Sequence, residues 1–127
     1  MEPIKKRILV VEDEHSVTRL LKLCLEESDR FVVKAENAGK HALAAAREFQ
    51  PDLILLDVMM PDVDGGMLAS QFREDPRFKD VPIVFLTALA TPGEVHEHGG
   101  LIGGSPFLAK PVDIPEVIAC VDKQLAA

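Results

Sequence analysis

Four short runs of apolar residues, each continuous rather than alternating with polar residues, constrain the fold of this chain more than any other feature. They occupy residues 8–11, 53–56, 83–86 and 106–109. A strand that is buried on both faces has this pattern, and such strands form parallel sheets covered by helices. A fifth run, residues 31–35, includes Lys34 and is more polar, which favours a strand at the edge of the sheet.

Amphipathic helical patterns separate these runs. They cover residues 14–27, 38–49 and 66–73, and a last helix begins after Asp113, which has Glu116 three residues on in a typical capping arrangement. Strands that alternate with helices predict an α/β domain with a parallel sheet and helices on both of its faces. Because we find no internal repeat or linker, we expect one domain over residues 1–127.

One segment departs from this alternation. A helix is expected between the fourth and fifth strands, but residues 91–105 contain five glycines and a proline. Since each interior glycine costs a helix about 1 kcal/mol relative to alanine, the composition favours a short helix over residues 92–98 followed by a glycine-rich loop. The alternatives are a longer surface loop and a mobile segment beside the functional site.

Composition excludes several classes of protein. The formal net charge is −7 over 127 residues, which argues against a basic face for nucleic acid. No apolar run approaches the roughly 20 residues that span a bilayer, and residues 1–7 lack the apolar stretch of a signal peptide. We therefore expect a cytoplasmic protein without a nucleic acid or membrane partner. Cys24 and Cys120 are distant in sequence and are expected to be buried free thiols.

Polar residues that can take part in a reaction follow the buried runs. Glu12 and Asp13 come after the first run, Asp57 after the third along the chain, Thr87 after the next, and Lys110 after the last. The carboxyl ends of parallel strands share one edge of a sheet, where ligands bind. Three converging carboxylates require a cation, and hard oxygen ligands suit Mg²⁺.

This arrangement predicts phosphoryl chemistry. Asp57 can act as a nucleophile toward a phosphoryl group and form an aspartyl phosphate. The metal and the Lys110 ammonium would neutralise the phosphoryl oxygens, and the Thr87 hydroxyl can hydrogen-bond one of them. Each residue alone also has an ordinary explanation, since an aspartate at a strand end is often a helix N-cap. Their conjunction at the ends of four strands favours the functional interpretation.

The sequence resembles a known family in segments 10–14, 55–65, 84–88 and 108–111, which read VVEDE, LLDVMMPDVDG, VFLTA and LAKP. These look like the motifs of response regulator receiver domains of two-component systems, and the resemblance covers nearly the whole chain. It implies a flavodoxin-like, doubly wound, five-stranded parallel sheet of strand order 2-1-3-4-5. It also implies a switch rather than an enzyme, one that takes a phosphoryl group from a sensor histidine kinase or phosphotransfer protein and controls a downstream effector protein.

The same resemblance implies the roles of individual residues. Asp57 would be the phosphoacceptor; Asp13, Asp57 and the Met59 carbonyl would bind Mg²⁺, and Glu12 would act through water. Thr87 and Lys110 would contact the phosphoryl group. Phe107, three residues before the lysine, would be a switch residue together with Thr87. An ordinary core phenylalanine is the alternative for Phe107.

One segment departs from the family pattern, and two other positions affect the expected rate of dephosphorylation. Residues 103–106 read GGSP where the family commonly has a turn of the Gly-Ala-Asp-Asp type, which puts the fourth helix in doubt. Met59 and Leu89, at positions that influence hydrolysis of the phosphoryl group in the family, are apolar. They offer no group to position a water, so slow autodephosphorylation is expected.

Two other functions remain possible on the same fold. One is a Mg²⁺-dependent aspartyl-phosphate phosphatase, although Met59 stands where a second carboxylate would act as a general acid. The other is a flavin- or nucleotide-binding module, which needs a phosphate-binding loop after the first strand. Residues 12–14, Glu-Asp-Glu, would repel phosphate there unless a metal intervened.

Overall fold

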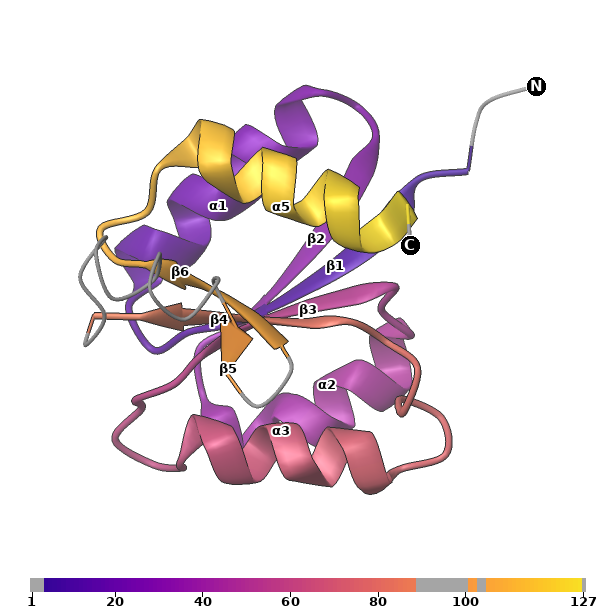
Figure 1. Cartoon of the computed structure of the whole chain (residues 1–127), viewed down its shortest axis with the longest axis vertical. Coiled ribbons are helices and arrows are strands. Elements are labelled where there is room, and N and C mark those ends of the chain that lie inside the picture. Colours follow the sequence, from indigo (N-terminus) through magenta and orange to yellow (C-terminus); the bar gives the residue numbers. More distant parts are fainter. Residues whose placement is uncertain (1–3, 89–100, 103–104, 127) are drawn as a thin grey trace.

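A sheet of six strands organises the molecule in the computed structural model, which describes residues 4–88, 101–102 and 105–126 (Figure 1). The strands are β1 (Lys6–Val11), β2 (Phe31–Glu36), β3 (Leu53–Asp57), β4 (Ile83–Thr87), β5 (Leu101–Ile102) and β6 (Ser105–Ala109). Their order in the sheet is β2-β1-β3-β4-β6-β5. The first five strands in this order pair in parallel. The predicted 2-1-3-4-5 topology is therefore confirmed, with the polar strand β2 at the edge.

The sixth strand corrects the prediction of a glycine-rich loop. Leu101 and Ile102 form β5, which pairs antiparallel with Pro106 and Ser105 of β6. The two apolar β-formers stand between glycine pairs, so the composition of the whole segment obscured them. In the sequence, Gly-Gly separates these two paired segments, and a Gly-Gly dipeptide is itself a hairpin signal. The short helix expected over residues 92–98 lies outside the described residues.

Helices cover both faces of the sheet, as the alternation predicts. They are α1 (His15–Glu27), a 3₁₀ turn η1 (Gly39–His41), α2 (Ala42–Phe49), α3 (Gly65–Glu74) and α5 (Ile114–Ala126). Figure 1 shows α1 and α5 on one face and α2 and α3 on the other. The second helix was expected as one piece over residues 38–49. It instead begins with η1, and it ends where Gln50 adopts a left-handed φ of 57° before Pro51.

Two apolar clusters, one on each face, explain the continuous apolar runs. Successive residues of β1 and β3 alternate between the clusters: Leu9 and Ile54 pack toward α2 and α3, and Val10 and Leu55 toward α1 and α5. Each of these side chains is buried completely. Because both faces are covered, a polar residue within these runs would be buried as well. The polar residues of β1, β3 and β4 are consequently found at the ends of these strands.

Two remaining expectations concern cysteine and the membrane. Cys24 and Cys120 are free and only partly buried, so the expectation of full burial was too strong. Among the residues that the structure describes, none of the helices has the length and hydropathy that crossing a bilayer requires.

Candidate metal centre at the carboxyl edge of the sheet

Three carboxylates meet at the carboxyl edge of the sheet. β1 and β3 are neighbours in register, with Val11 beside Leu56, so the residues that follow them emerge together. Glu12, Asp13 and Asp57 each offer a carboxylate oxygen, and these oxygens all lie within 4.8 Å of one another. Sequence reasoning predicted this convergence because the carboxyl ends of parallel strands share one edge of a sheet.

Lys110 closes one side of this group. Its backbone N–H donates to the Thr87 carbonyl at 2.9 Å, which fixes the end of β6 beside the end of β4. Its Nζ lies 2.5 Å from Glu12 Oε1, 3.4 Å from Glu14 Oε1 and 3.6 Å from Asp57 Oδ2. The ammonium is therefore held mainly by Glu12, while it remains close to Asp57.

Burial governs the electrostatics of the cluster. Glu12 is 0% exposed and Asp57 is 3% exposed. Burial raises the pKa of Glu12 to about 7, although hydrogen bonds from Lys110 and from the Glu14 N–H oppose this shift. Burial also raises the pKa of Asp57. Burial lowers the pKa of Lys110, but its hydrogen bond to Glu12 and the nearby carboxylates raise it on balance. The raised pKa values of Glu12 and Asp57 indicate that the Lys110 ammonium does not fully offset the cost of burying these two carboxylates.

The hydrogen bonds of Asp57 test whether a cation fits. Asp57 Oδ1 accepts from the Met59 N–H at 3.2 Å. Asp57 Oδ2 is buried and accepts no hydrogen bond within the part of the chain that the structure describes. A buried oxygen without a donor is unfavourable unless an ion or water reaches it. Together with the two neighbouring carboxylates, this oxygen fits a hard divalent cation such as Mg²⁺.

The other predicted residues surround the cluster. Thr87 is buried at the end of β4, next to Lys110. The Met59 side chain is 61% exposed, and its backbone forms an isolated bridge with Asp64. Phe107 is 3% exposed and lies beside Phe85 in the adjacent strand. Leu89 lies outside the described residues, so slow autodephosphorylation stays a prediction.

Sequence reasoning missed residues that shape the centre. The Asn37 side-chain amide donates to the Glu12 carbonyl at 2.8 Å, a contact between two strands' ends that no local pattern reveals. A Cβ on Gly65 would lie 2.3 Å from the Asp57 carbonyl oxygen, so only glycine lets α3 begin so close to Asp57. Asp64 caps α3 by accepting from the Gly66 and Met67 N–H groups. An aspartate directly before a helical pattern is a recognised N-cap signal and could have been used.

Comparisons with known proteins agree with this architecture. A profile of the response regulator receiver domain family matches residues 8–122. The response regulator Rre1 of Synechocystis sp. is 38% identical over 125 residues, which cover 98% of this chain and 53% of Rre1. The polar-differentiation response regulator DivK of Brucella anthropi is 30% identical over 120 residues, covering 94% of this chain and 96% of DivK.

A solved structure extends the comparison to three dimensions. A putative response regulator from Chloroflexus aurantiacus superimposes with a TM-score of 0.82 at 29% identity, covering 98% of this chain and 100% of that one. The chain spans about half or less of the length of the first curated relatives that it matches. Taken with the sheet order and the acidic cluster, the match over residues 8–122 shows that this chain belongs to the response regulator receiver domain family of two-component systems.

Proposed function

We propose that Asp57 accepts a phosphoryl group in a Mg²⁺-dependent reaction, and that this modification switches the affinity of the domain for a partner protein. Phosphorylation and Mg²⁺ binding are general features of the family. The observation that carries the proposal is Asp57 Oδ2, which is buried, accepts no hydrogen bond from the described residues and lies 3.6 Å from the Lys110 ammonium. This oxygen has both the free lone pairs of a nucleophile and a cation beside it.

The metal would be held by Asp13, Asp57 and the Met59 carbonyl, with Glu12 acting through water. When bound, it supplies positive charge against the phosphoryl oxygens. The close approach of the Glu12, Asp13 and Asp57 oxygens supports this assignment. The pairing of Glu12 with Lys110 keeps the ammonium at the centre before any phosphoryl group arrives.

The chain's own residues would then do the following. Asp57 Oδ2 attacks phosphorus, the bond from phosphorus to the donor atom breaks, and an acyl phosphate forms. The Lys110 ammonium pairs with a phosphoryl oxygen and offsets its charge. The Thr87 hydroxyl donates to another phosphoryl oxygen. Phe107 lies in β6, the strand next to the one that ends at Thr87. Its side chain would change its packing as Thr87 moves.

Partners follow from the same chemistry. A sensor histidine kinase or phosphotransfer protein would supply the phosphoryl group, and a downstream effector protein would read the switch. We place these events in the cytoplasm and expect the chain itself to bind neither nucleic acid nor membrane. The family assignment favours such a signalling switch over the phosphatase and the flavin- or nucleotide-binding alternatives.

One experiment tests the proposal. The protein is incubated with MgCl₂ and acetyl phosphate, and its intact mass is measured over time. We expect one added phosphoryl group, no addition when EDTA replaces MgCl₂, and no addition in Asp57→Asn. Asp80→Asn, which changes an exposed aspartate away from the cluster, is the matched control and should be labelled normally. Labelling that persists in Asp57→Asn would refute Asp57 as the acceptor.

A further inference from the structure

Residues 37–40 lie in the connection between β2 and α2 and contact one of the two loops that flank the acidic cluster. The Asn37 side-chain amide lies 2.8 Å from the Glu12 carbonyl oxygen and 3.0 Å from Thr18 Oγ1. Thr18 is buried in α1, and its hydroxyl donates to the His15 carbonyl at 3.1 Å. Asn37 therefore joins the end of β1 to the first turn of α1. The loop between these two points contains Glu12 and Asp13.

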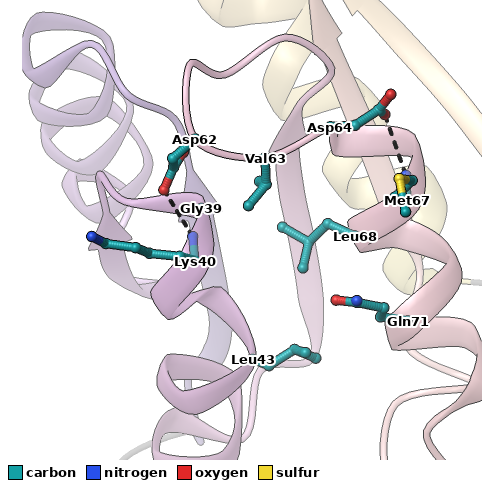
Figure 2. Close-up of a pocket in the computed structure, with 9 residues that line it drawn as sticks. All are labelled: Gly39, Lys40, Leu43, Asp62, Val63, Asp64, Met67, Leu68 and Gln71. Carbon is teal, nitrogen blue, oxygen red and sulfur yellow. Dashed lines mark hydrogen bonds between the residues drawn. The ribbon is translucent and has the colours of Figure 1, made fainter.

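The same connection also contacts the loop between β3 and α3, residues 58–64. Asp62 Oδ2 accepts a hydrogen bond from the Lys40 backbone N–H at 3.0 Å, as Figure 2 shows. This bond holds the pKa of Asp62 below its usual value. Val63 packs directly on Gly39, where a Cβ would lie 2.3 Å from Val63 Cγ2. Gly39 thus allows a close approach that any side chain would block.

A groove lies beneath this contact. It has a volume of about 460 Å³ and is bordered by η1, α2 and α3. In Figure 2 the Val63 side chain points into it from the loop, and the Lys40 side chain extends away from it. The contact between loop and η1 therefore depends on the Lys40 backbone and on Val63, rather than on the Lys40 ammonium.

The loop of residues 58–64 is also closed at its base. The Gly65 N–H donates to the Val58 carbonyl at 2.9 Å, and Met59 bridges to Asp64. Base and tip together restrict the backbone around Met59, which follows Asp57 by two residues. A carbonyl that serves as a metal ligand must be held in position, because ligands left to find their place reduce metal affinity.

We propose that residues 37–40 form a clamp between the two loops that hold the metal ligands, with Asn37 and Asp62 as positioning residues for Mg²⁺ binding. This inference rests on the proposed function. It adds that Mg²⁺ affinity depends on residues that do not contact the ion. Replacing a residue that hydrogen-bonds to a metal ligand, without contacting the metal, typically lowers metal affinity by 10- to 100-fold. For residues that are partly exposed to solvent, we expect the lower end of that range.

Calorimetric titration with MgCl₂ tests the clamp on the whole chain. We expect Asn37→Ala and Asp62→Ala each to weaken Mg²⁺ affinity about tenfold. Asp62→Asn keeps an oxygen acceptor and should stay within about twofold of the original protein. Lys40→Ala is the matched control, because it keeps the backbone N–H that Asp62 binds, and its affinity should be unchanged.

Amide hydrogen exchange in metal-free protein gives a readout that does not involve the ion. The Lys40 N–H should exchange faster in Asp62→Ala than in the original protein or Asp62→Asn, while the urea midpoint of unfolding changes little. Gly39→Ala should disturb the clamp in a second way, because its Cβ would displace Val63 without removing a hydrogen-bonding group. It should also weaken Mg²⁺ binding.

The outcomes separate the clamp from the proposed function. If the original protein binds Mg²⁺ and the Asn37→Ala and Asp62→Ala variants bind it equally well, the clamp is wrong and the proposed function stands. An equal loss of affinity in Lys40→Ala would also overturn it. If the original protein binds no Mg²⁺, the metal role in the proposed function fails, and the clamp fails with it.

Discussion

At the scale of single residues, Lys110 determines how the acidic cluster is neutralised. It approaches Glu12 at 2.5 Å and Asp57 at 3.6 Å, so one ammonium serves two buried carboxylates whose pKa values are both raised by burial. Losing that ammonium would leave both carboxylates without their cation in a desolvated position. Lys110 therefore offsets the charge of the acidic site, and under the proposed function it would also stabilise the phosphoryl group.

The first prediction concerns this residue. Lys110→Ala should lower the rate of labelling by acetyl phosphate at least about tenfold, because a preorganised charge beside the transferred group is lost. Intact-mass time courses in MgCl₂ give the rate. Lys123→Ala removes an exposed lysine of α5 and should be labelled normally. A rate in Lys110→Ala equal to that of the original protein would contradict the role of the ammonium.

The second prediction follows from Glu12, whose pKa is raised from 4.5 to about 7 in the folded protein. The folded state holds this proton more tightly than the unfolded state does. The stabilisation is therefore complete below about pH 4.5 and is lost as the pH rises through 7. In EDTA, the free energy of unfolding should increase by roughly 1–2 kcal/mol between pH 8 and pH 5.5.

Urea unfolding at several pH values measures this dependence. Glu12→Gln should reduce it, and Asp57, whose pKa burial also raises, contributes in the same direction. Asp62 and Asp75 have lowered pKa values, and they would reverse the trend only at lower pH, where they become protonated. Stability that falls between pH 8 and pH 5.5 in the original protein would mean that Glu12 is ionised throughout that range.

At the scale of elements, the exposed edge of the sheet is protected by the neighbouring helix. β2 lies at the edge, where unpaired backbone groups invite association with other strands. Two side chains of α1 pair with these groups: Glu26 Oε2 accepts from the Val33 N–H at 3.0 Å, and Lys22 Nζ donates to the Val33 carbonyl at 3.2 Å. Helix α1 thus covers one face of the sheet and also part of its edge.

The third prediction tests this protection. Glu26→Ala should lower the free energy of unfolding by about 1 kcal/mol, because the Val33 N–H loses its acceptor. Glu27→Ala, which changes the next and more exposed residue of the same helix, is the control and should stay within about 0.5 kcal/mol. Urea denaturation measures both. Equal losses in the two variants would show that Glu26 acts through helix propensity or net charge rather than through β2.

The elements themselves were largely predictable from sequence, and the exceptions have physical causes. Continuous apolar runs and 3.6-residue periodicity identified β1, β3, β4 and the main helices, since both patterns result from burial. The 3₁₀ turn η1 (Gly39–His41) was not predicted, because residues 38–49 show one continuous helical pattern in which a 3₁₀ first turn has no separate signal. Strand β5 was not predicted because two residues are too few for a periodicity to show.

At the scale of the whole molecule, the topology brings together residues that are nearly a hundred positions apart. Glu12 and Lys110 meet because β1, β3, β4 and β6 are neighbours in that order. The acidic cluster was predictable because the carboxyl ends of parallel strands share one edge of the sheet. This rule did not reveal that Lys110 binds Glu12 more closely than Asp57, or that Asn37 supports the Glu12 carbonyl. Both depend on side-chain conformations that only the packed structure determines.

The last prediction links this cluster to the stability of the whole chain. A ligand that binds only the folded state stabilises it, by about 2.7 kcal/mol when its concentration is a hundred times its dissociation constant. Because Glu12, Asp13 and Asp57 converge only in the folded protein, MgCl₂ should raise the thermal midpoint in a saturable manner. Asp13→Asn should remove most of that rise, and Asp80→Asn should keep it. The chain has a net charge of −7, so salt alone relieves some repulsion, and NaCl of equal ionic strength gives the baseline. A rise in NaCl as large as that in MgCl₂ would show that the cluster responds to screening and not to a bound divalent ion.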